Sequence, residues 1–566
     1  MNHRIMPGVI FCCLTAFCAA AHGQKYLFED GISITTACQL DGANEVYHGY
    51  IEHRLTITNS SNQARHVEVS APERSFGGYR AEGGVDVPAH SGAVLSLYHP
   101  VGSMWSASSA VVRIDGRVQQ DRMTVTSPNS PHWNAVSMVM FSRDVPPEMP
   151  MQLERVAASR PRLAHVASYD VRQWSDNWLA YTPFEALAVT PRDITNMPPG
   201  VWSAIRGWVE CGGVLLVIQA ADGPEYEPPR EWRLISERAQ DSAYAASLGE
   251  CRVVNSYADS DWGWLHGYLN TRMPTLQKDG GRLNSEFDLV PNLQRTSTPI
   301  LMVLIPIALI IGPVNLFMLA RKNKRIWMLV TVPAFSFVAC ASLYGYALAS
   351  EGLTPWGRTV EITVLDQRSR RASSIGWLAM YSPLTPRRGL TFATSSELTL
   401  QGVDMNHMGD RLVRCGDSQY LTSGWIQARI PMFLTHRRSQ IRRERVEIIH
   451  SDGEVLAVNG LGTGIKSLHV AGPDGSVWSG ADIPAGRQAK LVKVGPLSAT
   501  TSHSLIISTD WRQKARSIVA DPTRYLVENS YVAIMDAPVF LEQPVDNLRL
   551  DKSVCVVIGY LQEGSE

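Results

Sequence analysis

The sequence predicts a multidomain protein with an N-terminal β-sandwich, an α/β domain with a parallel sheet, a two-helix transmembrane hairpin and a C-terminal all-β region. Three patterns lead to this prediction: alternating polar and apolar runs at both ends, continuous apolar strands beside a helical run, and two long uncharged segments around a basic turn. The length of 566 residues exceeds the ~100–200 residues of a usual domain, so several cores are expected. The net charge of -1 argues against a surface built as a whole to attract nucleic acid.

Residues 1–23 have the organisation of a signal peptide, with a basic start at His3 and Arg4, an apolar stretch and small residues before Gln24. This leader predicts that the chain is exported. An uncleaved anchor helix is the alternative, although the apolar stretch is short for a bilayer span of ~20 residues.

Two regions have the pattern of antiparallel strands. Residues 24–130 alternate apolar and polar side chains, as in "YIEHRLTITN" and "AVLSLYHP", and predict the β-sandwich. Residues 351–566 are again strand-like, in "RTVEITVLDQ", "RVEIIH" and "AKLVKV", and predict a β-rich exported region.

Residues 131–275 predict the α/β domain. A helical run "GVWSAIRGWVE" is followed by the turn "CGG", whose glycines are expected to end the helix, and by the apolar strand "VLLVIQA". The stretches "WLAYTPFEALAV" and "WVECGGVLLV" resemble the core of glutamine-amidotransferase-like domains, and this resemblance implies a flavodoxin-type fold. Active members place a cysteine in a turn after a strand, whereas Cys211 precedes one, so no catalytic residue is predicted.

The cysteines offer one possible disulfide, between Cys211 and Cys251, because export permits a bridge and both residues belong to the same predicted domain. Isolated buried thiols are the default alternative. No cysteine pair has the CxxC spacing of a zinc or redox site, so we expect no metal and no cofactor.

The centre of the chain predicts a membrane hairpin. The uncharged segments 299–320 and 326–350 are each long enough to cross a hydrocarbon core of ~30 Å. The turn 321–325 holds four cations, and each would cost ~2.5–3.5 kcal/mol at mid-bilayer depth, so the turn is predicted to be cytoplasmic. The amide of Asn315 is expected to pair across the two helices. The topology-determining cations are Arg321, Lys322, Lys324 and Arg325.

Two clusters are candidate contact residues. Trp262 and Trp264 lie in "YADSDWGW", where tryptophan could form part of an interface or of a solvated loop. The stretch "HRRSQIRRER" could bind anionic headgroups or wall polymers, or it could be a strand face paired with Glu444 and Glu447. The candidate arginines are Arg437, Arg438, Arg442 and Arg443.

The whole order of segments, and above all "GPVNLFMLARKNKR" and "VLAVNGLGTGIKSLHVAGPDG", resembles a family of bacterial envelope membrane proteins with no assigned activity. The resemblance implies an envelope location and the same architecture. The cytoplasmic basic turn and the signal peptide together predict a multi-pass protein of the bacterial inner membrane with both large halves in the periplasm. We therefore expect a non-enzymatic, membrane-anchored scaffold or binding module whose partners are the inner membrane and other envelope proteins, not nucleic acid. The alternatives are a degenerate amidotransferase-like hydrolase and an accessory subunit of an envelope transporter.

Overall fold

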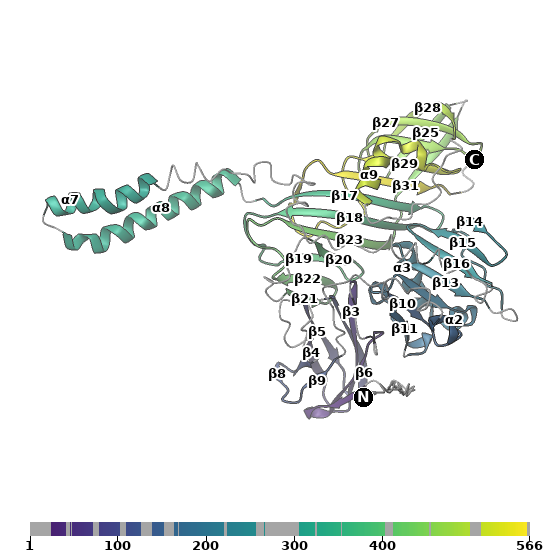
Figure 1. The fold of residues 1–566 in the computed structure, drawn as a ribbon, viewed down its shortest axis with the longest axis horizontal. Coiled ribbons are helices and arrows are strands. Elements are labelled where there is room, and N and C mark those ends of the chain that lie inside the picture. The colour runs from purple at the N-terminus through teal and green to yellow at the C-terminus, as the bar shows by residue number, and fades with distance from the viewer. Residues whose placement is uncertain are drawn as a thin grey trace, which may run out of the picture.

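Strands dominate the part of the chain that the structure describes, and there they form four sheets (Figure 1). The computed structural model describes residues 24–40, 43, 46, 48–71, 79–101, 109–125, 138–151, 163–167, 169–219, 224–255, 265, 305–322, 325–351, 354–401, 411–451, 454–497 and 511–562. The predicted signal peptide, residues 1–23, lies outside this part of the chain.

A four-stranded and an eight-stranded sheet pack face to face at the N-terminal end, in the region predicted to be a β-sandwich. Alternate residues such as Ile34, Leu55 and Val69 are fully buried between them, as the period-two pattern predicts. The first sheet contains β1 (Lys25–Leu27), β2 (Ile32–Ala37), β3 (Tyr50–Asn59) and β6 (Ser91–Pro100), with the 3-10 turn η1 (Glu29–Gly31) after β1.

The eight-stranded sheet combines strands from both sides of the central helices. β21 lies parallel to β5, with Val413 opposite Ala81. Strands that follow the helices in sequence therefore complete the N-terminal sandwich. The sheet contains β19 (Leu390–Ala393), β22 (Ser418–Ser423), β21 (Arg411–Cys415), β5 (Tyr79–Val87), β4 (Arg65–Ala71), β7 (Ser109–Ile114), β8 (Arg117–Val118) and β9 (Met123–Thr124).

The seven-stranded sheet has the order β11-β10-β12-β13-β16-β15-β14, in which the first five strands are parallel and the last two are antiparallel. Helix α3 ends at Glu210 with Cys211 as its C-cap, and Gly212 follows with a φ of +115°, as expected of the diglycine. The elements are β10 (Met138–Phe141), β11 (Leu163–Val166), η2 (Val171–Gln173), η3 (Trp178–Tyr181), β12 (Ala186–Val189), α2 (Pro191–Asn196), α3 (Pro199–Glu210), β13 (Val214–Ile218), β14 (Arg233–Glu237), β15 (Asp241–Ala246) and β16 (Gly249–Val254).

The predicted flavodoxin-type, amidotransferase-like fold is wrong. β12 and β13 are fully buried, as the apolar runs predict, but the sheet ends in the antiparallel strands β15 and β14, and its core continues into the C-terminal half. Leu215 and Val217 share a core with Leu378 and Met380 of the C-terminal half. A continuous apolar strand shows that both faces are covered, not that helices cover them.

The twelve-stranded sheet follows the central helices. Helix α9 (Trp511–Ala520) packs on one face through Ala515 and Ile518, and the 3-10 turn η7 (Pro522–Tyr525) follows it. The strands are β20 (Glu397–Gln401), β23 (Met432–Ile441), β18 (Arg371–Tyr381), β17 (Trp356–Asp366), β31 (Val554–Tyr560), β29 (Ser530–Met535), β26 (Ile465–Ala471), β27 (Ser476–Ile483), β28 (Gln488–Pro496), β25 (Glu454–Gly460), β24 (Arg445–Ser451) and β30 (Arg549–Leu550).

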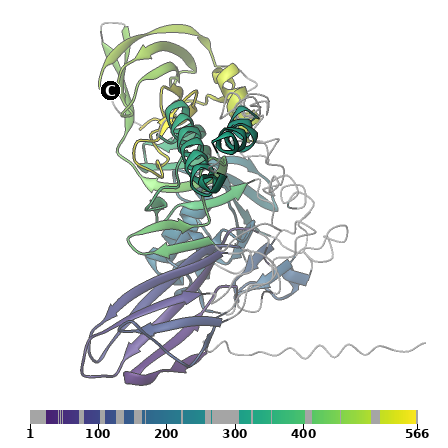
Figure 2. The ribbon, with the colours of Figure 1, turned by 90° about the vertical axis from the view of Figure 1, so that its left-hand side faces the viewer.

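Two central helices form an arm that projects from the sheets, and they lie side by side (Figures 1 and 2). The arm consists of the π-helix η4 (Ile310–Val314), α7 (Asn315–Arg321), the 3-10 turn η5 (Arg325–Trp327) and α8 (Met328–Glu351). As expected, the Asn315 amide pairs across the helices, donating to Thr331 Oγ1 at 2.8 Å.

The predicted transmembrane helices at 299–320 and 326–350 are wrong. Within the described residues, no helix combines the length and the apolarity that a membrane crossing needs. The π-helix η4, with Pro313 inside it, precedes α7 and leaves α7 only seven residues long. This finding contradicts the predicted location as a multi-pass inner-membrane protein. Arg321 and Lys322 are exposed at the end of α7, and Lys324 lies outside the described residues.

Candidate functional site

A cavity of about 540 Å³ lies where the edge of the seven-stranded sheet meets the strand ends of the twelve-stranded sheet. One wall is the segment from Glu231 to Ile235, which leads into β14. The turn between β17 and β18 supplies Asp366, Arg368 and Ser369, and the end of β31 supplies Tyr560. The cavity therefore draws its walls from both halves of the chain.

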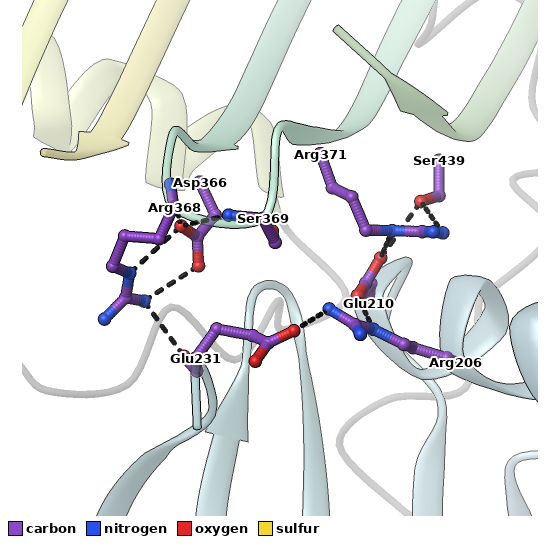
Figure 3. Close-up of polar contacts among 8 residues, drawn as sticks. All are labelled: Arg206, Glu210, Glu231, Asp366, Arg368, Ser369, Arg371 and Ser439. Carbon is purple, nitrogen blue, oxygen red and sulfur yellow. Dashed lines mark hydrogen bonds and ion pairs between the residues drawn. The ribbon is translucent and has the colours of Figure 1, made fainter. Parts of the chain in front are cut away.

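Glu210 anchors the junction beside this cavity (Figure 3). It ends α3 and is only 3% exposed. Its carboxylate accepts from Arg206 Nε at 2.8 Å, from Arg371 Nε at 2.6 Å and from Ser439 Oγ at 3.1 Å. Arg371 and Ser439 belong to β18 and β23, so one buried carboxylate joins α3 to two strands of the C-terminal half.

A second ion pair fixes the turn that faces the cavity. Arg368 donates twice to Asp366, from Nε at 3.0 Å and from Nη2 at 2.8 Å, and its guanidinium lies 5.4 Å from the ring centre of Tyr560. Arg368 also donates to the backbone oxygen of Glu231 at 2.9 Å, and the Glu231 carboxylate binds Arg206 (Figure 3). The two ion pairs therefore form one network through Glu231.

The network keeps its cations charged. The hydrogen bond that Arg368 donates to Asp366 raises the pKa of Arg368 above its usual value, against the opposing effect of burial. Burial lowers the pKa of Arg206, but Glu210 and Glu231 outweigh it and leave that pKa raised. Because the carboxylates accept hydrogen bonds from these guanidiniums, the arrangement suits hydrogen bonding to a ligand better than proton transfer.

The predicted arginine cluster is largely involved in contacts within the fold. Arg437 donates to both oxygens of Glu397, at 2.5 and 2.8 Å, and also to the backbone oxygen of Cys211 at 3.4 Å. Arg438 pairs with Glu542. The cluster's proposed contact with anionic partners stays a prediction.

The other two arginines of that cluster lie just beyond β23. Arg442 donates to Glu444 at 3.0 Å, and its guanidinium lies 5.6 Å from the ring centre of Phe540. Arg443 is exposed.

The remaining predicted residues do not join the cavity. Trp262 and Trp264 lie outside the described residues. Cys211 and Cys251 are buried free thiols rather than a bridge, and burial raises the pKa of both.

Sequence reasoning missed Glu210, Asp366, Arg368 and Arg371. The hairpin turn in "VLDQRSRR" was a visible signal, since a carboxylate two residues before an arginine can fix such a turn. The partnership of Arg371 with Glu210 joins residues 161 positions apart and has no local signal.

Two further buried polar contacts lie in and beside the N-terminal sandwich. His48 Nε2 pairs with Glu185 of the seven-stranded sheet region. Inside the sandwich, His53 Nε2 and His99 Nε2 are 3.1 Å apart, and both residues are 2% exposed. His99 Nδ1 is 2.8 Å from the Pro100 oxygen, which only accepts, so His99 Nδ1 carries the proton and His53 Nε2 donates to His99.

Comparisons with known proteins do not add a family. No family model and no curated protein matches the chain. Among solved structures, the yeast delta-COP-I mu-homology domain matches at 7% identity, with 36% of this chain and 95% of that chain covered and a TM-score of 0.18. The Amycolatopsis orientalis exo-chitosanase CsxA matches at 11% identity, with 89% of this chain and 62% of that chain covered and a TM-score of 0.18. These scores are too low to support any statement about fold or function.

Proposed function

We propose that this protein is a non-enzymatic scaffold with a binding site at the junction of the seven-stranded and twelve-stranded sheets. The observation that carries the proposal is the network around Glu210 and Asp366, in which each carboxylate holds an arginine. A general acid or base must change its protonation during the reaction, which a tightly held carboxylate resists. A binding site benefits instead from polar groups fixed in advance.

The arm supports the scaffold part of the proposal. Its exposed apolar side chains include Phe317 at 64%, Leu329 at 83% and Phe337 at 76% exposure. Contiguous exposed apolar surface marks a contact surface. We propose that the arm holds a partner protein while the sheets present the cavity.

Turnover measurements test the binding-site part. The purified chain is assayed against p-nitrophenyl esters, p-nitroanilides and p-nitrophenyl glycosides, with Glu231→Gln and Cys211→Ala as comparison variants. We expect no turnover above the buffer blank. Turnover that either substitution abolishes would instead support the alternative, a degenerate hydrolase.

Site-specific photocrosslinking in cells tests the arm. A benzoylphenylalanine in place of Phe337 is compared with one in place of Val118, which is 60% exposed on β8 of the sandwich. We expect a discrete adduct from position 337 that position 118 does not give. Identical patterns from both positions would contradict a contact role for the arm.

A further inference from the structure

The N-terminal sandwich and the end of the twelve-stranded sheet repeat one arrangement of antiparallel strands. In the N-terminal copy, β3 pairs with β2 and β6, and β4 pairs with β5. In the C-terminal copy, β25 pairs with β24 and β28, and β26 pairs with β27. The sequences agree as well, in "VDVPAHSGAVL" at 85–95 and "ADIPAGRQAKL" at 481–491.

A buried asparagine occupies the same corner of both copies. Asn59 Nδ2 donates to the backbone oxygen of Val87 at 3.0 Å, and Asn459 Nδ2 donates to that of Ile483 at 2.9 Å. Each asparagine also donates to the backbone oxygen of the residue four positions later, at 2.8 Å in both cases. The two copies can therefore be compared position by position.

The outer face of β2 and β3 differs from its counterpart. Thr35 on β2 is opposite Thr56 on β3, whereas the equivalent pair in the C-terminal copy is Ile449 opposite Leu456. The C-terminal copy forms the same strand pair with two apolar side chains. The fold therefore does not require hydroxyl groups at these positions, and they are available for another role.

A cavity of about 370 Å³ lies at this threonine pair, between the outer face of β2 and β3 and the turn η2. Arg54 Nη1 donates to the backbone oxygen of Gln173 at 3.0 Å and joins the turn to β3. Thr56, Arg172 and Gln173 line the cavity and are exposed, so it opens to solvent. Its volume falls within the ~300–1,000 Å³ of small-molecule sites.

Hydroxyl and amide groups line much of the cavity. Thr35 and Thr56 contribute hydroxyls, and Gln39 and Gln173 contribute amides. Gln39 is only 7% exposed, and neither atom of its side-chain amide has a hydrogen-bond partner among the described residues. The neighbouring Tyr181 hydroxyl donates instead to the Ser175 oxygen at 2.7 Å. Because buried amides are nearly always paired, Gln39 indicates a partner from outside the described chain.

Glu52 supplies a fixed acceptor in the same cavity. Its carboxylate is buried and accepts from the Tyr98 hydroxyl at 2.7 Å and from Ser175 Oγ at 3.1 Å, both at Oε1. A carboxylate has about four acceptor positions, so two hydrogen bonds leave capacity for a ligand hydroxyl.

The charges at the cavity favour neither a cation nor an anion. Burial raises the pKa of Glu52, and the nearby positive charge of Arg54 opposes this effect. The other cation, Arg172, is exposed and follows Asp170, whose carboxylate accepts from the Arg172 N–H at 2.8 Å. Each guanidinium therefore has a carboxylate in its neighbourhood, and a neutral polar ligand fits this lining best.

We propose that this cavity binds one residue of a neutral sugar. Sugar hydroxyls donate and accept, as do the threonine hydroxyls and the Gln39 amide, and one of them donates to Glu52. The inference goes beyond the proposed function, because this cavity shares no lining residue with the junction cavity in the part of the chain that the structure describes.

Saturation-transfer difference NMR on the full chain tests the inference. The probes are the methyl glycosides of glucose, galactose, mannose and N-acetylglucosamine, and tetrahydropyran-2-methanol is the comparison compound. We expect saturable binding of at least one glycoside. We expect none of the comparison compound, because it has the same ring size without the ring hydroxyls and would leave the polar groups of the site unpaired.

The repeat supplies matched variants. Thr35→Ile with Thr56→Leu copies the C-terminal pair and should weaken glycoside binding about tenfold, since it removes two hydrogen-bonding groups. Thr56→Val, at an exposed position, is a milder change and should weaken binding about threefold. Thr58→Val copies Val458 on the same face of β3 but outside the cavity, and should leave the affinity unchanged. Circular dichroism checks that each variant is folded.

Three results would overturn the inference. They are no saturable binding of any of the four glycosides, an affinity that neither cavity variant changes, and equal losses in Thr58→Val and Thr56→Val. Binding of methyl glucuronide or inorganic phosphate without binding of a neutral glycoside would also overturn it, because the occupant would then be an anion.

Discussion

The Glu210 junction and the histidine contacts of the N-terminal sandwich hold buried polar groups in opposite ways. At the junction, Arg206 and Arg371 pair with one carboxylate. In the sandwich, His53 and His99 are paired as neutral rings, because burial lowers both pKa values. Buried polar groups in two regions of one body can therefore respond differently to acid.

The largest expected effect is at the junction. Glu210→Gln leaves the partly buried Arg371 without its anion and Arg206 with Glu231 alone, and we expect it to lower the free energy of unfolding by about 3–5 kcal/mol. Urea unfolding followed by tryptophan fluorescence measures this. Glu237→Gln, an exposed carboxylate on β14, is the control and should change the stability by less than about 0.5 kcal/mol. Equal effects of the two variants would show that the Glu210 network does not hold the sheets together.

The histidine pair predicts the next largest effect. The folded pKa of His99 is about 4, while an unfolded histidine titrates near 6.5, so below 6.5 the unfolded chain takes up protons that the folded chain does not. The stability is therefore full above pH 6.5 and is lost as the pH falls towards 4, by about 3 kcal/mol over that window. Urea midpoints across this range measure the loss, which should be smaller in His99→Gln. A wild-type curve parallel to that of the variant would contradict the neutral pair.

The third effect concerns His48, whose contribution to stability depends on pH in the opposite direction to that of His99. Burial lowers its pKa, but Glu185 outweighs burial and leaves the pKa raised. A group whose pKa is raised in the folded state contributes its full stability below its unfolded-state pKa. That contribution is lost as the pH rises through the folded-state pKa. We expect His48→Gln to cost about 1 kcal/mol at pH 6 and less at pH 9. A larger cost at pH 9, measured by the same unfolding assay, would reverse this assignment.

The smallest expected effect concerns the Arg368–Asp366 pair, which is more exposed than the Glu210 network. The Arg368 side chain is 33% exposed, so Arg368→Lys should lower the stability by less than about 1 kcal/mol even though lysine cannot bind Asp366 through two nitrogens. Thermal unfolding measures this change. A loss as large as that of Glu210→Gln would mean that the turn, rather than the buried carboxylate, holds the junction.

Local structure could be predicted from the sequence where neighbouring residues determine it. The run "GVWSAIRGWVE" forms α3 and "VLLVI" forms β13, because periodicity and the diglycine act over a few residues. The core that β13 shares with the C-terminal half could not be predicted, since an apolar strand looks the same whatever covers it.

The candidate site depends on pairings between distant residues. β5 and β21 lie parallel although more than half of the chain separates them, and Glu210 meets Arg371 across 161 residues. Such contacts have no spacing rule within one sequence. The uncharged central segments show a different error, in which a clear pattern predicts the wrong structure. Their composition predicted a membrane span, but composition does not show where the helices break.

The central claim is that strands from the two sides of the arm form one sheet, so that both halves make a single body. Glu82 and Arg414 are opposite each other on β5 and β21. Neighbouring strands place opposite residues within the reach of a disulfide. The most direct test is the double variant Glu82→Cys, Arg414→Cys, oxidised under mild conditions and mapped by non-reducing peptide mass spectrometry. We expect near-complete bridging between positions 82 and 414 in the folded chain, and two free thiols at these positions after oxidation would contradict a shared sheet.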